Sequence, residues 1–307
     1  MIFSSPGMIE NSARLLKTGL FAVLLLWLVT PAPAGAQGGH VIVHCLDEHL
    51  GTVQETLASD CKGRVVGEDE AAALHRQRRD YIQKVLSKTP DTKLQGRQLT
   101  RVGSGFFIAE DGSVLTSQHL VADCSGVSVA PRFGELALAT AVVPDEQADL
   151  ALLKTNVAPP GIAAFAQGSG SAVMGSAFVS GYPEQGMVAV TPVLMPVEIL
   201  RRESDTPSGP AMIVRGNVRK GNSGGPLLDT GGNVIGVVVA KVDSVAMYKT
   251  TGEAVRDIGL VLPGDRVQRF LEAQGVRYRQ DQRQPLMQES RILEDTRAFM
   301  VQVGCWQ

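Results

Sequence analysis

The sequence predicts a mainly β protein with a helical segment on each side of the β region. Strands are predicted at residues 105–109 and 113–116, because two apolar runs are joined there at the turn-forming pair Asp111 and Gly112. Another strand-like apolar run follows Asp149. A domain of about 170 residues buries about 70% of its unfolded surface, so the β region of this 307-residue chain is long enough to form its own core.

Two helices are predicted from apolar residues at helical spacing. The first covers residues 68–88, and Pro90 ends its pattern. The second runs from Pro263, which suits a first helical turn, to Gly275, which suits a C-terminal cap. Closer to the C-terminus, the sequence predicts a short helix and then an apolar strand over residues 299–306, which is expected to pair with an existing sheet edge.

The hexapeptide GNSGGP at residues 221–226 is the strongest signal of chemistry in the chain. The Ser223 hydroxyl is a candidate nucleophile, which needs a neighbouring base and a pocket of hydrogen-bond donors for the oxyanion that it creates. Gly221 can adopt backbone conformations that a Cβ forbids, so its N–H and that of Ser223 can point into one oxyanion hole. A glycine-rich turn between strands is the alternative for this motif taken alone, so the partners of Ser223 decide.

Histidine is scarce, with five residues in the chain, which makes the search for a base short. His119 lies just past a predicted strand, where a rigid position suits a general base; a hydrogen-bonded core histidine is the alternative. Asp149 opens a strand-like run and is preferred as the carboxylate that orients the ring, ahead of Asp123 and Asp145, whose turn-like surroundings suit solvated acids. The sequence therefore predicts a catalytic triad of His119, Asp149 and Ser223.

The remaining histidines carry weaker signals. His40, His44 and His49 lie close to Cys45, which would suit a metal site, but no fixed ligand spacing supports one. His75 belongs to a charged helical stretch and is predicted to be solvated. No metal and no cofactor is therefore expected.

The chain order His119, Asp149, Ser223 resembles that of the chymotrypsin-fold serine proteases of the HtrA/Deg type. The motifs TSQHLV, ADLALLK and GNSGGPLL carry the resemblance, which covers about residues 100–275. The resemblance implies an all-β fold of two six-stranded antiparallel β-barrels, with an N-terminal helical extension and a C-terminal helix. It also implies a serine endopeptidase that acts on proteins or peptides in quality control or processing, with an oxyanion hole formed by the backbone of Gly221 and Ser223.

Part of a substrate pocket also follows from the resemblance. Asn217, six residues before Ser223, corresponds to the pocket floor, where an aspartate would select basic side chains. Val237, Val238 and Val239 would line one wall, so a small or medium apolar side chain before the scissile bond is expected.

A segment similar to a zymogen activation site, GRVVGED at residues 63–69, is expected to be a decoy. In trypsin-like zymogens the new N-terminus pairs with an aspartate immediately before the nucleophile, whereas this chain has the uncharged Asn222 there. Activity without cleavage at Arg64 is therefore expected. The rival hypothesis is a catalytically silent or partner-activated, chaperone-like peptide-binding module on the same fold.

Four parts are expected along the chain: a signal peptide at 1–36, an N-terminal extension with a helix at 37–97, a trypsin-like protease domain at 98–275, and a short C-terminal tail at 276–307. Basic residues, a short apolar run and a small-residue site ending at Ala36 indicate a cleaved signal, so the protein is expected to be periplasmic or secreted, with no membrane span in its mature form. An uncleaved N-terminal anchor is the open alternative. The tail is too short for the PDZ domain that many HtrA/Deg proteases carry.

Charge and cysteine content set further bounds. The formal charge is −2, from 29 basic and 31 acidic residues, so no nucleic-acid partner is expected. Export to an oxidising compartment favours disulfides among the four cysteines. Cys45 with Cys61 and Cys124 with Cys305 form one of three connectivities, free thiols are a further alternative, and the sequence does not choose among them. The oligomeric state is not predicted.

Overall fold

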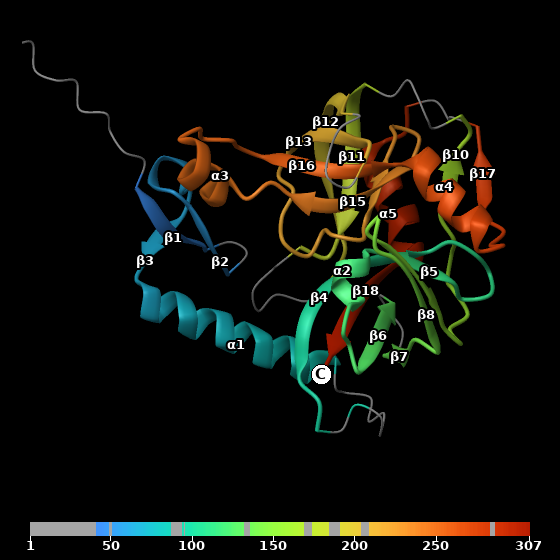
Figure 1. The fold of residues 1–307 in the computed structure, drawn as a ribbon, viewed down its shortest axis with the longest axis horizontal. Helices are drawn as coiled ribbons and strands as arrows, with labels where there is room; N and C mark the ends of the chain where they lie inside the picture. The colour runs from blue at the N-terminus through green and yellow to red at the C-terminus, as the bar shows by residue number, and fades with distance from the viewer. Residues whose placement is uncertain are drawn as a thin grey trace, which may run out of the picture. The chain divides into compact units, whose positions relative to one another are not determined.

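Three β-sheets of eight, seven and three strands, with five α-helices, make up the described part of this computed structural model (Figure 1). The structure describes residues 41–48, 51–86, 94, 96–131, 136–168, 174–183, 191–203, 209–282 and 286–307. The predicted signal peptide at residues 1–36 lies outside them. Of the helices that the structure describes, none has both the length and the apolar character needed to cross a membrane.

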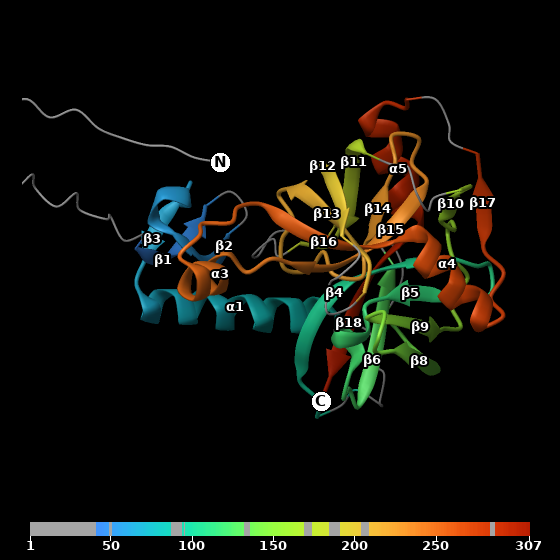
Figure 2. The same ribbon diagram turned by 45° about the horizontal axis from the view of Figure 1, so that its top comes forward.

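Six strands of the largest sheet close into a barrel. They follow one another in the order β14, β11, β12, β13, β16 and β15, and β14 also pairs with β15, which closes the ring. Beyond β15, the parallel strands β10 and β17 lie side by side (Figure 2). The strands of this sheet are β10 (Ala164–Ala166), β11 (Gly175–Gly181), β12 (Val193–Glu203), β13 (Ala211–Gly216), β14 (Pro226–Leu228), β15 (Val234–Lys241), β16 (Ile258–Pro263) and β17 (Arg279–Asp281).

The seven-stranded sheet curls into a half-barrel, with β7 at one end of its strand order and β8 at the other. The predicted chymotrypsin-like two-barrel fold is confirmed, although this half is an open sheet of seven strands and not a closed barrel of six. Its strands, in sheet order, are β7 (Ala137–Leu138), β6 (Gly126–Pro131), β18 (Met300–Trp306), β4 (Leu99–Phe107), β5 (Val114–Thr116), β9 (Leu150–Lys154) and β8 (Ala141–Asp145).

The C-terminal strand β18 lies in the middle of the half-barrel. It pairs antiparallel with β4 on one side and with β6 on the other, so the expectation that it pairs at a sheet edge is wrong. All seven of its residues are buried, which suits a central strand that is covered on both faces. Trp306 donates an indole hydrogen bond to Ser128 Oγ at 2.8 Å, and a disulfide joins Cys305 to Cys124.

One hydrophobic core joins the half-barrel to the barrel. Phe106 and Leu152 from the half-barrel belong to the same buried cluster as Leu228 and Val237 from the barrel. A second cluster, drawn from the barrel strands, fills the barrel interior. Because a close-packed core tolerates little displacement, the loops at the junction of the two sheets are held in fixed relative positions.

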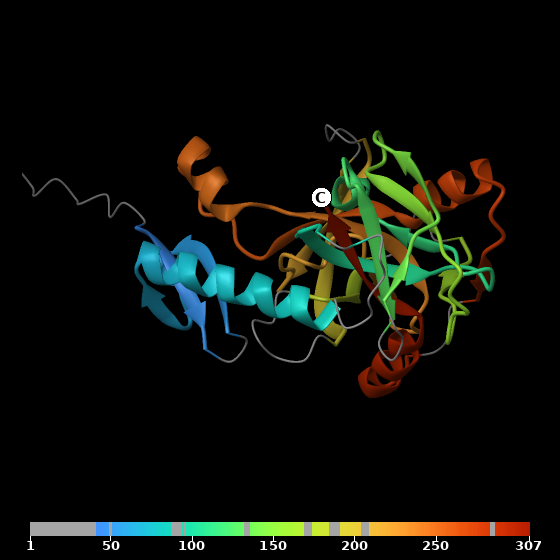
Figure 3. The ribbon, with the colours of Figure 1, turned by 90° about the horizontal axis from the view of Figure 1, so that it is seen from below.

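Residues 42–86 form a small unit that we call the N-terminal module. Its three strands have the order β2, β1, β3, and the predicted helix is confirmed as α1, which packs on β1 and β2 (Figure 3). A disulfide between Cys45 and Cys61 closes the chain around β2. The sequence predicted the helix but not the sheet. The elements are β1 (Ile42–Asp47), β2 (Thr52–Leu57), the 3₁₀ turn η1 (Ala58–Asp60), β3 (Arg64–Val66) and α1 (Glu68–Leu86).

The other helices are short and lie between or after the strands. The predicted closing helix is confirmed as α4, and Gly275 just beyond it has a positive φ of 65°, as a C-terminal cap requires. Asp243 caps α3, because its carboxylate accepts from the backbone N–H groups of Val245 and Ala246. The bounds are α2 (Gln118–Val121), α3 (Ser244–Thr251), α4 (Gly264–Ala273) and α5 (Glu289–Phe299).

Candidate active site

The carboxylate of Asp149 contacts His119 at two points. Asp149 Oδ2 lies 2.8 Å from His119 Nδ1, and Asp149 Oδ1 accepts the backbone N–H of His119 at 2.9 Å. A carboxylate at Nδ1 favours the neutral tautomer that carries its proton there, which leaves Nε2 as the proton acceptor. The ring is therefore oriented on one edge and is able to act as a base on the other.

Two paired strands bring these residues together. His119 lies on α2, directly after β5, and Asp149 immediately precedes β9; β5 and β9 pair antiparallel with Thr116 opposite Ala151. Asp149 has a φ of 52°, in the left-handed region that aspartate tolerates better than most residues. Of the competing acids, Asp145 uses its carboxylate to accept the backbone N–H of Ala148.

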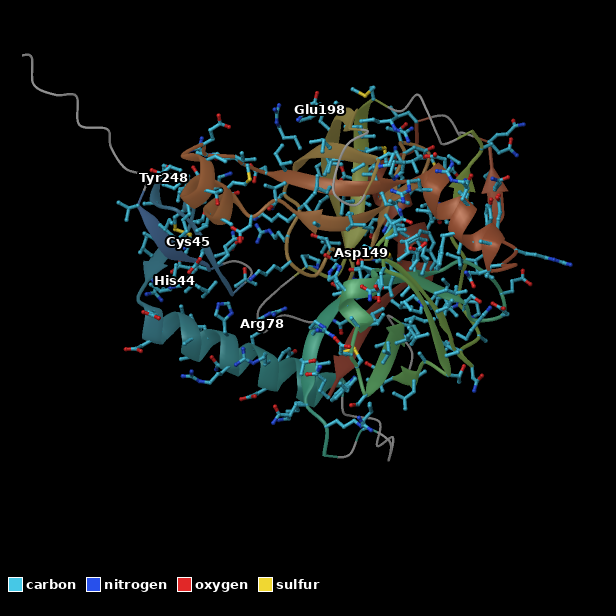
Figure 4. All side chains as sticks on the ribbon, in the orientation of Figure 1. His44, Cys45, Arg78, Asp149, Glu198 and Tyr248 are labelled. Carbon is cyan, nitrogen blue, oxygen red and sulfur yellow. A yellow bond between two sulfur atoms is a disulfide. The ribbon has the colours of Figure 1, made fainter. Side chains whose placement is uncertain are left out.

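Ser223 lines the same cavity as His119 and Asp149. The cavity has a volume of about 940 Å³, and its walls come from the barrel, from the half-barrel and from the N-terminal module. Asp149 lies on one side of this cavity and His44, from β1, on the other (Figure 4). Within the described residues no direct hydrogen bond joins Ser223 Oγ to the His119 ring, and such bonds often tighten only in the substrate complex.

Ser104, on β4, forms hydrogen bonds to the loop that contains Ser223. Its hydroxyl donates to the carbonyl of Gly221 at 2.6 Å and accepts the backbone N–H of Tyr182 at 2.8 Å. Its backbone N–H donates to the carbonyl of Ser223 at 2.9 Å. Ser104 is fully buried, so these bonds form where water does not compete. One residue of the half-barrel thus bonds two carbonyls of the loop, one through its side chain and the other through its backbone.

Two glycines of the motif occupy positions that a side chain would disrupt. Gly221 has a φ of 93°, and a Cβ there would collide with the carbonyl oxygen of Tyr182. Gly224 has a φ of 80°, and a Cβ there would collide with the carbonyl oxygen of Ser104. The glycines are therefore required by both conformation and space.

Asn222 forms a compact turn with Arg219. The backbone N–H of Arg219 donates to Asn222 Oδ1 at 2.8 Å, and the N–H of Asn222 donates to the carbonyl of Arg219 at 3.1 Å. Within the described residues, the N–H groups of Gly221 and Ser223 on either side of Asn222 have no protein acceptor. The site therefore contains an oriented imidazole, a hydroxyl and two available donors, which are the groups that acyl transfer needs.

The family model for the trypsin-like peptidase domain matches residues 103–237. The chain contains a trypsin-like peptidase domain. Similarity to curated proteins agrees with this: a probable periplasmic DegP-like serine endoprotease of Brucella suis is 29% identical over 182 residues, which is 55% of this chain and 32% of that protein. An uncharacterised protein, y4bJ of Sinorhizobium fredii, is 31% identical over 205 residues, 66% of this chain and 32% of that protein.

The chain spans about a third of the length of these two curated relatives. Among solved structures, the inactive form of the Rv3671c protease is 29% identical, with a TM-score of 0.45, covering 57% of this chain and 84% of that one. His119, Asp149 and Ser223 all fall within the matched residues.

The residues predicted for the substrate pocket of the trypsin-like domain are not all in the cavity. Val239 lines it, whereas Val237 and Val238 are fully buried, the first in the shared core and the second in the barrel interior. Asn217 accepts a hydrogen bond on Oδ1 from Arg219 Nε at 2.9 Å. Side chains alternate along a strand, so three consecutive valines of β15 cannot all face one pocket.

Cationic side chains gather along the cavity wall next to Ser223. Arg219, Lys220 and Lys241 all line it. The pKa of the Lys241 amine lies below its ordinary value, because burial disfavours the charged form; Asp257 opposes this effect and Arg219 adds to it. The apolar side chains Val239, Leu260 and Leu262 line the same cavity.

The metal-site alternative loses one of its ligands. Cys45 is in a disulfide and has no thiolate to offer, and His40 and His49 lie outside the described residues. His44 lines the cavity. In the part of the chain that the structure describes, no three His, Cys, Asp or Glu side chains lie close enough to hold a metal ion.

Two ion pairs connect the N-terminal module to the barrel. Arg219 Nη1 lies 3.2 Å from Asp47 Oδ2, and Arg256 Nε lies 2.6 Å from both carboxylate oxygens of Asp60. Neither these pairs nor the role of Ser104 was predicted from the sequence. Ser104 stands between two glycines at the start of a predicted strand, a local signal for close backbone contact, whereas no local pattern marks Asp47 or Arg219.

Proposed function

We propose that this protein is a serine endopeptidase that hydrolyses peptide bonds with His119, Asp149 and Ser223. The observation that carries the proposal is the hydrogen-bonded pair of His119 and Asp149 on the wall of the cavity that Ser223 also lines. Asp149 keeps the ring in the tautomer that accepts a proton at Nε2. The serine hydroxyl becomes a nucleophile when the imidazole takes its proton, and the carboxylate orients the imidazole and stabilises its charged form.

In the proposed reaction, His119 Nε2 takes the proton of Ser223 as Oγ attacks the peptide carbonyl. The N–H groups of Gly221 and Ser223 stabilise the oxyanion of the tetrahedral intermediate. His119 then protonates the leaving amine, and the C–N bond breaks to give an acyl-enzyme. Water attacks the acyl-enzyme with His119 again as the base, which releases the acid and restores Ser223.

The substrates that we propose are polypeptides bound in an extended form. β2 is an edge strand of the three-stranded sheet, and residues 52–56 all line the cavity. Consecutive residues of a strand line one cavity when the strand turns its edge towards it, because alternate side chains point to opposite faces. An extended peptide would find unpaired backbone groups there. Val239, Leu260 and Leu262 support the proposed preference for an apolar side chain.

Export to the periplasm or outside the cell, with a role in quality control or processing, belongs to the same proposal. Two disulfides, between Cys45 and Cys61 and between Cys124 and Cys305, fit an oxidising compartment. Protein degradation by the mature chain tests the proposed activity: Ser223→Ala should lose about a millionfold in turnover of an unfolded protein substrate. Equal turnover by the wild type and Ser223→Ala would refute it.

A further inference from the structure

Arg219 connects the loop before Ser223 to the N-terminal module. Its guanidinium lies 3.2 Å from Asp47 at the end of β1, and the two side chains are only 16% and 28% exposed. A partly buried ion pair is screened less by water and salt than a surface pair, so its loss is felt more strongly. The two residues are 172 positions apart in the chain, and Asp47 lies outside residues 103–237, which the family model matches.

The same arginine is built into the turn that orients the proposed oxyanion donors. Its Nε donates to Asn217 Oδ1 at 2.9 Å, and its backbone N–H and carbonyl both bond to Asn222. Gly221 and Ser223 flank Asn222, so a rotation of this turn changes the direction of both N–H groups. The position of the Arg219 side chain is therefore coupled to the geometry of the oxyanion hole.

Two lysines, Lys220 and Lys241, line the cavity together with Arg219. Burial lowers the pKa of the Lys241 amine, and Arg219 and Lys220 both lower it further, whereas Asp257 and Asp243 raise it. Arg219 therefore lies among charges of both signs, and like charges at this wall repel one another. Asp47 supplies a compensating negative charge from a rigid position, because it ends a strand paired on both sides and stands two residues from the Cys45–Cys61 disulfide.

We propose that Asp47 is a positioning residue of the active site, and that the N-terminal module acts through it to hold Arg219 and the oxyanion donors in place. The inference rests on the proposed function, since it assigns the oxyanion hole to Gly221 and Ser223. It also explains why residue 222 can be an uncharged asparagine: the ion pair that holds the loop is formed by Arg219, three residues earlier.

The kinetic test compares two variants that each remove one ion pair between the module and the barrel. Asp47→Asn should lower kcat about ten- to a hundredfold with a smaller change in KM, as expected when oxyanion donors are misplaced. Asp60→Asn breaks the pair with Arg256, which does not line the cavity, and should retain wild-type kcat. Asp47→Glu, which keeps the charge, should recover most of the turnover.

A transition-state analogue separates positioning from general damage. The affinity for a peptide boronic acid, whose tetrahedral adduct occupies the oxyanion hole, should fall with kcat/KM in Asp47→Asn. Equal kinetics and boronate affinity in Asp47→Asn and Asp60→Asn would overturn the inference, and so would an Asp47→Glu variant no better than Asp47→Asn. If the wild type itself neither cleaves protein nor reacts at Ser223, the proposed function fails.

Amide hydrogen exchange tests the coupling without any need for activity. Backbone exchange over residues 217–223 should become faster in Asp47→Asn and stay at the wild-type rate in Asp60→Asn, while exchange in β15 stays unchanged in both. Unchanged exchange of this loop in Asp47→Asn overturns the inference even in an active enzyme.

Discussion

Asp149 holds both the side chain and the backbone of His119, with one carboxylate oxygen 2.8 Å from Nδ1 and the other 2.9 Å from the backbone nitrogen. The carboxylate thereby fixes where α2 begins as well as how the ring is turned. Asp149 adopts a left-handed backbone conformation to reach this position. Backbone strain of this kind persists where the surrounding structure requires it, often at functional sites.

Asp149→Asn should lower kcat about ten-thousandfold while the protein stays folded, because an amide at Nδ1 favours the wrong tautomer of His119. Steady-state proteolysis and circular dichroism measure the two effects. Asp145→Asn is the matched control, since Asp145 only caps a turn at Ala148, and it should keep the wild-type rate. A similar loss in both variants would contradict the role given to Asp149.

Ser104→Ala should reduce both stability and activity. It leaves the part-buried carbonyl of Gly221 and the buried N–H of Tyr182 without their partner, at a cost of about 1–3 kcal/mol in the free energy of unfolding. It also frees the loop that carries the proposed oxyanion donors, so kcat should fall. Urea unfolding and proteolysis assays measure these quantities.

Ser128→Ala provides the control for Ser104→Ala. Ser128 is also buried, its hydroxyl accepts the indole N–H of Trp306 at 2.8 Å, and neither residue lines the cavity of the candidate site. It should lose a comparable free energy of unfolding and keep its kcat. If the two variants lose activity equally, the effect of Ser104 is one of stability alone.

Gly221→Ala should abolish activity, because a Cβ there meets both an unfavourable φ of 93° and the carbonyl of Tyr182. Gly252→Ala isolates the backbone effect, since Gly252 has a φ of 75° at the end of α3 but open space around it. It should cost about 1 kcal/mol or more in stability and leave kcat unchanged. An active Gly221→Ala enzyme would contradict the proposed geometry of the oxyanion hole.

The disulfide between Cys124 and Cys305 should contribute more to stability than that between Cys45 and Cys61. The first closes 181 positions of the chain and the second 16, so loop-closure entropy predicts about 5 and about 3 kcal/mol. Urea unfolding of the two paired Cys→Ser variants measures the difference. A larger loss of stability in the Cys45 and Cys61 variant would contradict this prediction. It would show that the N-terminal module contributes more to the free energy of unfolding than the loop-closure entropy of its disulfide.

Local motifs were enough to predict the candidate triad and the closing helix. His119, Asp149 and Ser223 each stand in a short pattern next to a strand or a glycine-rich turn, and the structure lines one cavity with all three. Helix α4 is marked by its own apolar face and cap. Such features depend on neighbours in sequence, which periodicity and motif spacing report directly.

The contacts that join distant segments could not be predicted in this way. The sequence predicts β18 as an apolar strand, but its place between β4 and β6 depends on pairing with residues about 170 to 200 positions earlier. The resemblance places Val237 and Val238 in a pocket wall, but both are buried in the cores, because the pattern of β15 does not say which face the barrel encloses. No sequence pattern around Asp47 or around Arg219 indicates that the two residues form an ion pair.

Covalent labelling of Ser223 tests the central claim most directly. The purified mature protein is treated with a fluorophosphonate probe, and the modified residue is located by mass spectrometry in the wild type and in His119→Ala. The account predicts labelling at Ser223 in the wild type and a large loss of labelling without His119, because the serine needs its base. A folded wild-type protein that is not labelled at Ser223, or that is labelled equally without His119, would contradict it and favour the peptide-binding module.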